Sequence, residues 1–224
     1  SIVVGFLSGV GAVLIKNGTH FIQLLLEGEL IDTYQTAFYF IFPLIGLILT
    51  YLAVTYIIRT PLTQGIPATL FAISKRKGIM KRFQMFGSLI TAPLTVGFGG
   101  SVGLEGPTVA TGAAMSSNVS RLFHMDQPTR TLLIGCAAAG AMSSIFKAPV
   151  AAIIFAVEVF ALDLTLTSLV PLLLASVSAI ITSYFFFRND VLLPFRIEES
   201  FQLRGLPYYI ALSVVAAFVS IYFT

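Results

Sequence analysis

A single carboxylate, that of Glu105, stands inside a long apolar stretch of the chain. The stretch from Phe83 to Asn118 contains no other ionisable side chain. Glu105 belongs to a glycine-rich segment with the sequence Gly99-Gly100-Ser101-Val102-Gly103-Leu104-Glu105-Gly106-Pro107. Because proline suits the first turn of a helix, Pro107 predicts a helix start here. Glu105 is then expected beside unpaired backbone N–H groups and the positive end of a helix dipole.

Two roles are consistent with this position of Glu105. A helix N-terminus is an anion site, and here it already holds a tethered anion. Glu105 could therefore be a gate, which blocks the site when the carboxylate is inside and frees it when the carboxylate leaves or takes up a proton. The alternative is an acidic first-turn residue that satisfies local donors and does nothing more. A buried charge at membrane depth is expensive and usually marks an ion pathway or a proton relay, which favours the gate in a membrane protein.

The composition places these elements in a membrane. Of the 224 residues, 57% are hydrophobic and 10% are charged, with a mean hydropathy of +0.94. Soluble domains carry about 25% charged residues. Several apolar stretches approach or reach the roughly 20 residues that a spanning helix needs. These stretches are Ser1–Leu26 (which contains Lys16, Asn17 and His20), Ala37–Ile58, Ala148–Leu162, Leu164–Phe187 and Leu206–Phe223. The sequence predicts an all-α, polytopic membrane protein that interacts with the lipid bilayer.

A second kind of segment is short and rich in small residues. It comprises Gly65–Ile73, Gly106–Val119 and Leu132–Phe146. A helix of fourteen residues covers roughly 21 Å, less than a hydrocarbon core of about 30 Å. Such broken helices are expected to begin or end within the membrane, buried in protein, as they do at transporter and channel binding sites. Gly5 and Gly9 should permit close packing of the first helix.

The basic residues gather in one place, Ser74–Arg82, which the positive-inside rule puts in the cytoplasm. Alternation of spans then puts Glu27–Gln35 and Arg188–Arg204 outside and Arg121–Arg130 inside. The basic run is short and lies between membrane segments, which argues against nucleic-acid binding. The N-terminus lacks the features of a signal peptide, and both ends are apolar, so we expect the chain to be part of a larger membrane domain. The single cysteine, Cys136, is expected to be a small core residue.

The segment Thr63-Gln64-Gly65-Ile66-Pro67 repeats the design of Leu104-Glu105-Gly106-Pro107. In each, a glycine lets the backbone turn just before a helix that a proline starts. Two such N-termini that converge in the membrane would hold an anion with partial charges only. A full lysine or arginine charge in the same place would bind the ion too tightly for fast passage.

With these motifs the chain resembles the CLC family of chloride channels and proton-coupled chloride transporters. The glycine-serine turn, the following glycine and the Glu-Gly-Pro of the family match Gly100–Pro107, and its Gly-Ser-Gly-Ile-Pro turn corresponds to Thr63–Pro67. Further family stretches resemble Gly135–Gly140, Ile145–Pro149 and Phe155–Glu158. The match runs in order through nearly the whole chain.

The resemblance implies roles for individual residues. Glu105 matches the gating glutamate, which competes with anions and takes up protons. The expected anion site is Gln64, Gly65, Ile66 and Pro67 together with Gly103, Leu104, Glu105 and Gly106. The resemblance also implies a membrane domain of two inverted halves: the first half to about residue 188, a loop over 188–205 and the start of the second half from about 206. The remaining second half and a homodimer, to whose interface Val150–Thr182 would contribute, are the implied partners.

Two departures from the family pattern bear on function. Gln64 stands where most members carry a serine whose hydroxyl touches the central anion. Val159 stands where exchangers typically carry an inner glutamate that relays protons, and family channels also tend to have an apolar residue there. We therefore expect a chloride channel; the alternative is a proton-coupled chloride antiporter. Glu158 is interpreted as structural, bonded to backbone donors, with a relay role as the alternative.

A different class of protein must also be weighed. Gly99–Gly103 formally matches the Gly-x-Ser-x-Gly elbow of serine hydrolases, which needs a strand, a sharp turn and a partner histidine. The flanks predict helices, and His20 and His124 lie in a helix and a polar loop, so we expect no enzyme. Two distant histidines and no carboxylate cluster provide no metal-ligand set. We expect no cofactor beyond chloride as the transported ligand, and a multi-pass protein of the plasma (inner) membrane.

Overall fold

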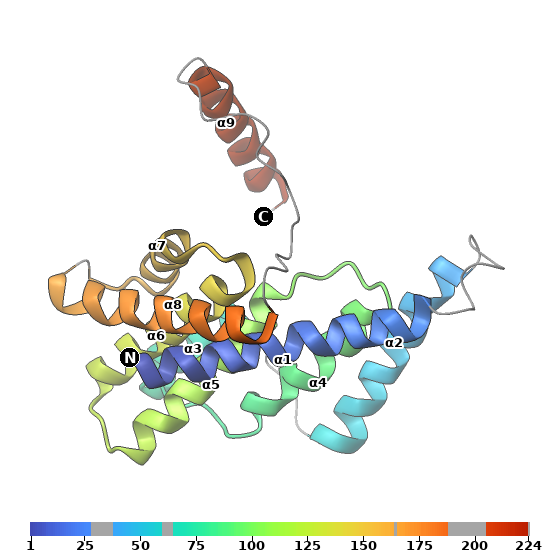
Figure 1. Ribbon diagram of the computed structural model, residues 1–224, viewed down its shortest axis with the longest axis horizontal. Coiled ribbons are helices and arrows are strands. Elements are labelled where there is room, and N and C mark those ends of the chain that lie inside the picture. Colours follow the sequence, from blue (N-terminus) through green and yellow to red (C-terminus); the bar gives the residue numbers. More distant parts are fainter. Residues whose placement is uncertain (28–37, 60–64, 164, 188–204, 224) are drawn as a thin grey trace. The chain divides into compact units, whose positions relative to one another are not determined.

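The computed structural model describes residues 1–27, 38–59, 65–163, 165–187 and 205–223 (Figure 1). Within these ranges all regular structure is helical, which confirms the predicted all-α class. In chain order the helices are α1 (Ile2–Glu27), α2 (Phe38–Leu52), the π-helix η1 (Ala53–Ile58), α3 (Ile66–Arg76), α4 (Gln84–Gly97), α5 (Glu105–Leu122), α6 (Gln127–Phe146), α7 (Pro149–Phe160), α8 (Leu166–Phe187) and α9 (Leu206–Phe223).

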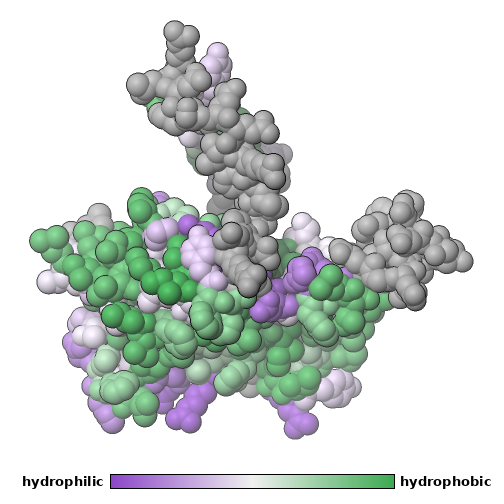
Figure 2. Space-filling view, viewed as in Figure 1, coloured by the Kyte–Doolittle hydropathy of each residue, from purple (hydrophilic) through white to green (hydrophobic). Residues whose placement is uncertain are grey.

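Four helical segments in the described residues are long and apolar enough to cross a membrane: Ile2–Leu26, Ile41–Ile58, Gln127–Phe146 and Leu166–Phe186. Three of them were predicted, and α1 continues without a break through its polar residues Lys16, Asn17 and His20. Helices α7 and α9 are shorter apolar helices. As Figure 2 shows, hydrophobic side chains cover much of the visible face of the molecule, as a protein surrounded by lipid requires.

Leu132–Phe146 is not a short helix by itself, because it belongs to α6, which begins at Gln127, next to Pro128, where the sequence indicates a helix start. Its first turn is polar, and Pro128 occupies a position near the helix start. Arg130 holds this turn in place, donating from Nη2 to the Met125 carbonyl at 2.9 Å and from Nη1 to the Lys77 carbonyl at 3.0 Å. Helices α3 and α4, with 11 and 14 residues, are short, as a broken intramembrane helix would be.

The small residues predicted to pack closely lie where α1, α6 and α8 meet. A Cβ on Gly5 would overlap the carbonyl oxygen of Ala175, and one on Gly9 would lie 3.0 Å from the Ala179 Cα. Helices α1 and α8 therefore touch backbone to backbone, and Figure 1 shows them side by side. Alanines 137, 138 and 139 of α6 are fully buried at 0% exposure, so the centre of the bundle is built from side chains with almost no bulk.

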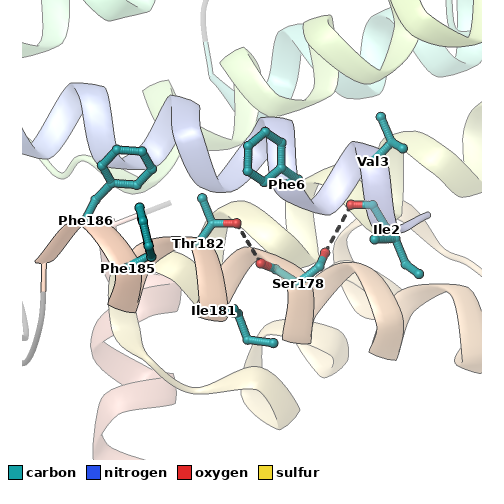
Figure 3. Close-up of a pocket in the computed structure, with 8 residues that line it drawn as sticks. All are labelled: Ile2, Val3, Phe6, Ser178, Ile181, Thr182, Phe185 and Phe186. Atoms are coloured by element: carbon teal, nitrogen blue, oxygen red, sulfur yellow. Dashed lines mark hydrogen bonds between the residues drawn. The ribbon is translucent and has the colours of Figure 1, made fainter.

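Beside this contact, α1 and α8 leave an apolar groove of about 460 Å³ (Figure 3). Phe6 projects into it from α1, and Ile181 and Phe185 line it from α8. Ser178 Oγ donates to the Ile2 carbonyl at 3.2 Å across the contact. The backbone contact between α1 and α8 already fixes their relative position along the helix axes. This hydrogen bond reinforces that position.

The basic turn after α3 and the turn after α5 lie at the same end of the bundle. Arg130, at the start of α6, reaches the Lys77 carbonyl, and Ser117 of α5 is bonded to both sides of Gly78–Met80. Its hydroxyl accepts from the Met80 N–H at 2.9 Å and donates to the Gly78 carbonyl at 2.6 Å. This agrees with the prediction that Ser74–Arg82 and Arg121–Arg130 lie on the same side of the membrane. The predicted outer loops, residues 27–35 and 188–204, lie outside the described residues apart from Glu27.

The chain divides into two compact units, Ser1–Leu192 and Leu193–Thr224. All of the helices that position the carboxylate of Glu105 belong to the first unit. In the second unit the structure describes α9, whose side chains from Leu206 to Tyr222 are exposed. A helix that is apolar on all sides and exposed on all sides needs lipid or another protein segment around it.

Candidate anion site

The turn between α4 and α5 is folded back against the end of α4. Gly99 has a φ of +87°, a conformation that only glycine adopts without strain. The Gly100 N–H donates to the Thr95 carbonyl at 2.9 Å, and the Val102 N–H donates to the Gly100 carbonyl at 2.9 Å. These bonds fix the path of the glycine-rich turn and bring Gly103 to the start of α5.

Leu104 anchors the N-terminus of α5. Its side chain is 7% exposed and packs in a cluster with Ile15, Ala92 and Ile145. Its carbonyl accepts from the Thr108 N–H at 3.0 Å and the Thr108 hydroxyl at 2.6 Å. The leucine side chain thus faces the core, so only the backbone of Leu104 is left to contact an anion.

The Glu105 side chain folds back over the preceding turn. It is the first residue of α5 and is partly buried. Its Oε2 lies so close to Gly103 that a Cβ on that glycine would overlap it. The absence of a side chain at Gly103 is therefore what allows the carboxylate to occupy this position. The sequence predicted the position of Glu105 at the helix start, but not this contact.

The N-terminus of α3 approaches that of α5. Gly65 precedes α3 with a φ of +86° and a ψ of −168°, a region that is essentially restricted to glycine. Its Cα would lie 3.7 Å from a Cβ placed on Gly106. The Gly65 carbonyl accepts from the Thr69 N–H at 3.4 Å and the Thr69 hydroxyl at 3.3 Å. The two glycine-proline turns predicted to converge therefore do meet.

Such a meeting of helix ends has a definite electrostatic character. The first N–H groups of a helix have no partner inside it, and the macrodipole makes that end positive. Pro67 and Pro107 lack an N–H, so the free donors come from the residues beside them, such as Ile66 and Gly106. The arrangement presents partial positive charge from two helices to one place, and Glu105 is the first residue of one of these helices.

Two predicted residues need separate comment. Gln64, the expected first contact of the central anion, lies outside the described residues. Glu158 was predicted to be bonded to backbone donors; its side chain is exposed on α7, and no donor to it lies among the described residues. The reason is that Glu158 lies in the last turn of α7, where the helix presents carbonyls rather than free N–H groups. Val159, next to it, is partly buried and carries no proton.

Lys147 is a partly buried charged residue that the sequence analysis did not single out. It ends α6 with a left-handed φ of 57°. Its ammonium group hydrogen-bonds Ser183 Oγ and lies 4.3 Å from the centre of the Tyr184 ring. The preceding residue, Phe146, packs against the cluster that holds Leu104. In the sequence, the one feature that could have drawn attention to Lys147 is that it is a charged residue directly after the apolar segment of α6.

The alternatives from other classes of protein find no support in the geometry. The Gly99–Gly103 turn follows the helix α4 and not a strand. His124 lies beyond the C-terminal end of α5, while Ser101 precedes its N-terminus, 18 helical residues away. Within the described ranges no group of three or more His, Cys, Asp or Glu side chains could hold a metal ion. Cys136 is fully buried in the core, as predicted.

Comparison with known proteins agrees with this arrangement. The family model described as "Voltage gated chloride channel" matches residues 45–224. The voltage-gated ClC-type chloride channel ClcB of Escherichia coli is 29% identical over 120 residues, which are 54% of this chain and 28% of that protein. A solved slow cyanobacterial Cl⁻/H⁺ antiporter has a TM-score of 0.75 at 21% identity, with 96% of this chain and 52% of that chain covered. A CLC-type fluoride/proton antiporter has a TM-score of 0.70 at 22% identity, covering 97% and 52%.

The fold and the comparisons thus define a polytopic helical membrane protein. The chain belongs to the voltage-gated chloride channel (CLC) family. It spans about half the length of the solved structures that it matches. The relatives and neighbours named above are described as a channel and as antiporters.

Proposed function

We propose that the protein passes chloride-like inorganic anions across a membrane as a channel that Glu105 gates. The observation that carries the proposal is the meeting of the α3 and α5 N-termini at Gly65 and Gly106. Partial charges from two helices can hold an anion without trapping it. The Glu105 carboxylate, which lies over Gly103 at the N-terminal end of α5, competes for this site as a tethered anion. Its protonation or outward rotation then frees the site.

The absence of proton coupling is the second part of the proposal, and it depends on Val159. A stoichiometric exchanger needs a path for protons from the cytoplasm to Glu105, and a valine cannot relay them. A single carboxylate can still take up protons from one side, so pH gates the pathway without exchange. The second candidate is a proton-coupled antiporter, which the two solved neighbours favour, since both are described as antiporters.

A flux experiment separates the two candidates. The full-length protein, reconstituted in liposomes, is placed under a chloride gradient while chloride and internal pH are both followed. We expect chloride to move without uphill proton movement, because the chain offers no second carboxylate at position 159. Proton pumping driven by chloride at a fixed ratio would instead establish the antiporter. Repeating the assay with fluoride, nitrate and bromide measures what Gln64 does to selectivity.

We further propose a homodimer in the plasma (inner) membrane, with α8 in the interface. Four apolar side chains of α8 recur at helical spacing and are 39% to 62% exposed: Val170, Leu174, Val177 and Ile181. They form a continuous stripe, as expected for a helix that contacts a partner. The family resemblance supports the same region, Val150–Thr182.

Val177→Trp is expected to shift the full-length protein from dimer to monomer. The indole is too large for a tightly packed interface, where overpacking destabilises by about 1–3 kcal/mol. Light scattering in detergent measures the change in mass. Leu47→Trp is the matched control, since Leu47 is 56% exposed on α2, a helix outside the proposed interface. A wild-type protein that is monomeric by light scattering and by cross-linking in membranes would refute the dimer.

A further inference from the structure

A large groove lies between α1, α4 and α5, at the end of the bundle that carries the basic turn. Its volume is about 650 Å³. The interior is apolar, with Leu7 from α1, Phe86 from α4 and Met115 from α5. Arg82, Arg121 and His124 line it as well. All of the charged or titratable side chains that line the groove are therefore basic.

The two arginines are available to bind a ligand. Both side chains are exposed, and neither forms an ion pair within the part of the chain that the structure describes. Arg121 is the second-to-last residue of α5, and Arg82 lies two residues before the first residue of α4. Both arginines therefore lie at helix ends. Guanidinium groups bind phosphate oxygens with paired, charge-assisted hydrogen bonds.

The shape of the groove restricts what can occupy it. Met115 lies seven residues before Leu122, the last residue of α5, which corresponds to about 10 Å along the helix. The groove therefore extends from the helix ends toward the middle of the bundle, along apolar side chains. Phe86 and Leu122, which both line the groove, are 57% and 74% exposed. A free phosphate would satisfy the arginines but leave this apolar surface uncovered, whereas an acyl chain would cover it.

We propose that this groove binds one anionic phospholipid, with its phosphate at Arg82 and Arg121 and an acyl chain along Leu7, Phe86 and Met115. His124 adds a donor on the rim. It has a left-handed φ of 50°, and its N–H donates to the Arg121 carbonyl at 3.1 Å, so it is held next to that arginine. The positive-inside rule assigns this end to the cytoplasmic side, where anionic lipids concentrate. The proposal does not depend on whether the protein is a channel or an antiporter.

Native mass spectrometry of the full-length protein tests the site. The protein in mild detergent is mixed with equal amounts of phosphatidylglycerol and phosphatidylcholine that carry identical acyl chains. We expect one phosphatidylglycerol to be retained, with a preference of roughly tenfold or more, since each basic residue near the surface contributes to binding of anionic lipid. Equal retention of the two lipids would overturn the proposal.

Two further arms locate the site and exclude other sources of phosphate. Arg82→Gln with Arg121→Gln should reduce phosphatidylglycerol to the level of phosphatidylcholine. Lys75→Gln with Lys77→Gln removes the same charge from exposed residues outside the groove and should leave the preference intact. Equal loss in both double variants, or no loss in the arginine variant, would refute this site. Glycerol phosphate in excess should not displace the lipid. Displacement would show that the arginines bind phosphate without any contribution from an acyl chain in the groove, and would refute the proposal.

Discussion

Anion flux through the Glu105→Gln and Glu105→Ala proteins is expected to be independent of pH. Glutamine imitates the protonated side chain, and alanine removes the tethered anion altogether. In the wild type the flux is expected to depend on pH, because a proton neutralises the tethered anion. Both variants should lose this dependence and stay open. Chloride efflux from liposomes, measured between acid and neutral pH, is the readout.

The control for these variants is Glu158→Gln, which neutralises the exposed carboxylate of α7. Its flux should follow the wild-type pH profile, because this group makes no contact with the site. A wild-type profile in both Glu105 variants would show that Glu105 only occupies the first turn of α5. Loss of pH dependence in the Glu158 variant would locate the titrating group elsewhere.

Gly103→Ala is expected to open the pathway at neutral pH although it leaves every ionisable group in place. The added Cβ would overlap the Glu105 Oε2, so the carboxylate must leave its position above the turn. Overpacking of this kind costs about 1–3 kcal/mol, which lowers the population of the blocking conformation by roughly fivefold or more. The same liposome assay at neutral pH detects the increase in chloride efflux.

The double variant Gly103→Ala with Glu105→Ala separates this effect from general damage to the turn. Once the carboxylate is gone, the alanine at position 103 has nothing to displace, so the double variant should match Glu105→Ala. Contacting residues show such non-additivity, whereas independent ones do not. Lower flux in the double variant than in Glu105→Ala would mean that the alanine disrupts the turn itself.

Much of the fold follows from hydrophobicity and proline positions. The apolar run Leu164–Phe187 and the observed α8, Leu166–Phe187, nearly coincide. Pro128 indicates the start of α6, but the small-residue segment Leu132–Phe146 underestimates the length of this helix. Its first turn, Gln127–Arg130, is polar, and hydrophobicity alone does not reveal that Arg130 is held by the Lys77 carbonyl. The π-helix Ala53–Ile58 was also missed, since its sequence is as apolar as the helix before it.

Helix ends show a further limit of prediction from sequence. Glycine is the usual signal for the left-handed residue that ends a helix. Here Lys77, Lys147 and Ala161 adopt that conformation after α3, α6 and α7. Tertiary contacts hold at least one of them: Lys147 is fixed through Ser183 and Tyr184. Contacts between distant segments cannot be recognised from local residue types.

For the anion site, the sequence predicted which glycines and prolines start the two helices and that these starts converge. It could not predict how the Glu105 side chain lies, because that depends on the three-dimensional path of the Gly99–Gly103 turn. It also assigned Leu104 to the anion site without showing that its side chain is buried against Ile15 and Ile145. The roles of these residues in transport remain predictions that the flux experiments test.

The backbone contact between α1 and α8 limits how this protein can move. With Gly5 against Ala175 and Gly9 against Ala179, neither helix can slide or rotate without a collision of main-chain atoms. Domain motions take microseconds to milliseconds, whereas side-chain rotation takes picoseconds to nanoseconds. If the helices of this half stay fixed, the anion pathway opens only through rotation of the Glu105 side chain. The gate that we propose can then operate on a much shorter timescale than a transporter that must rock one bundle of helices against another.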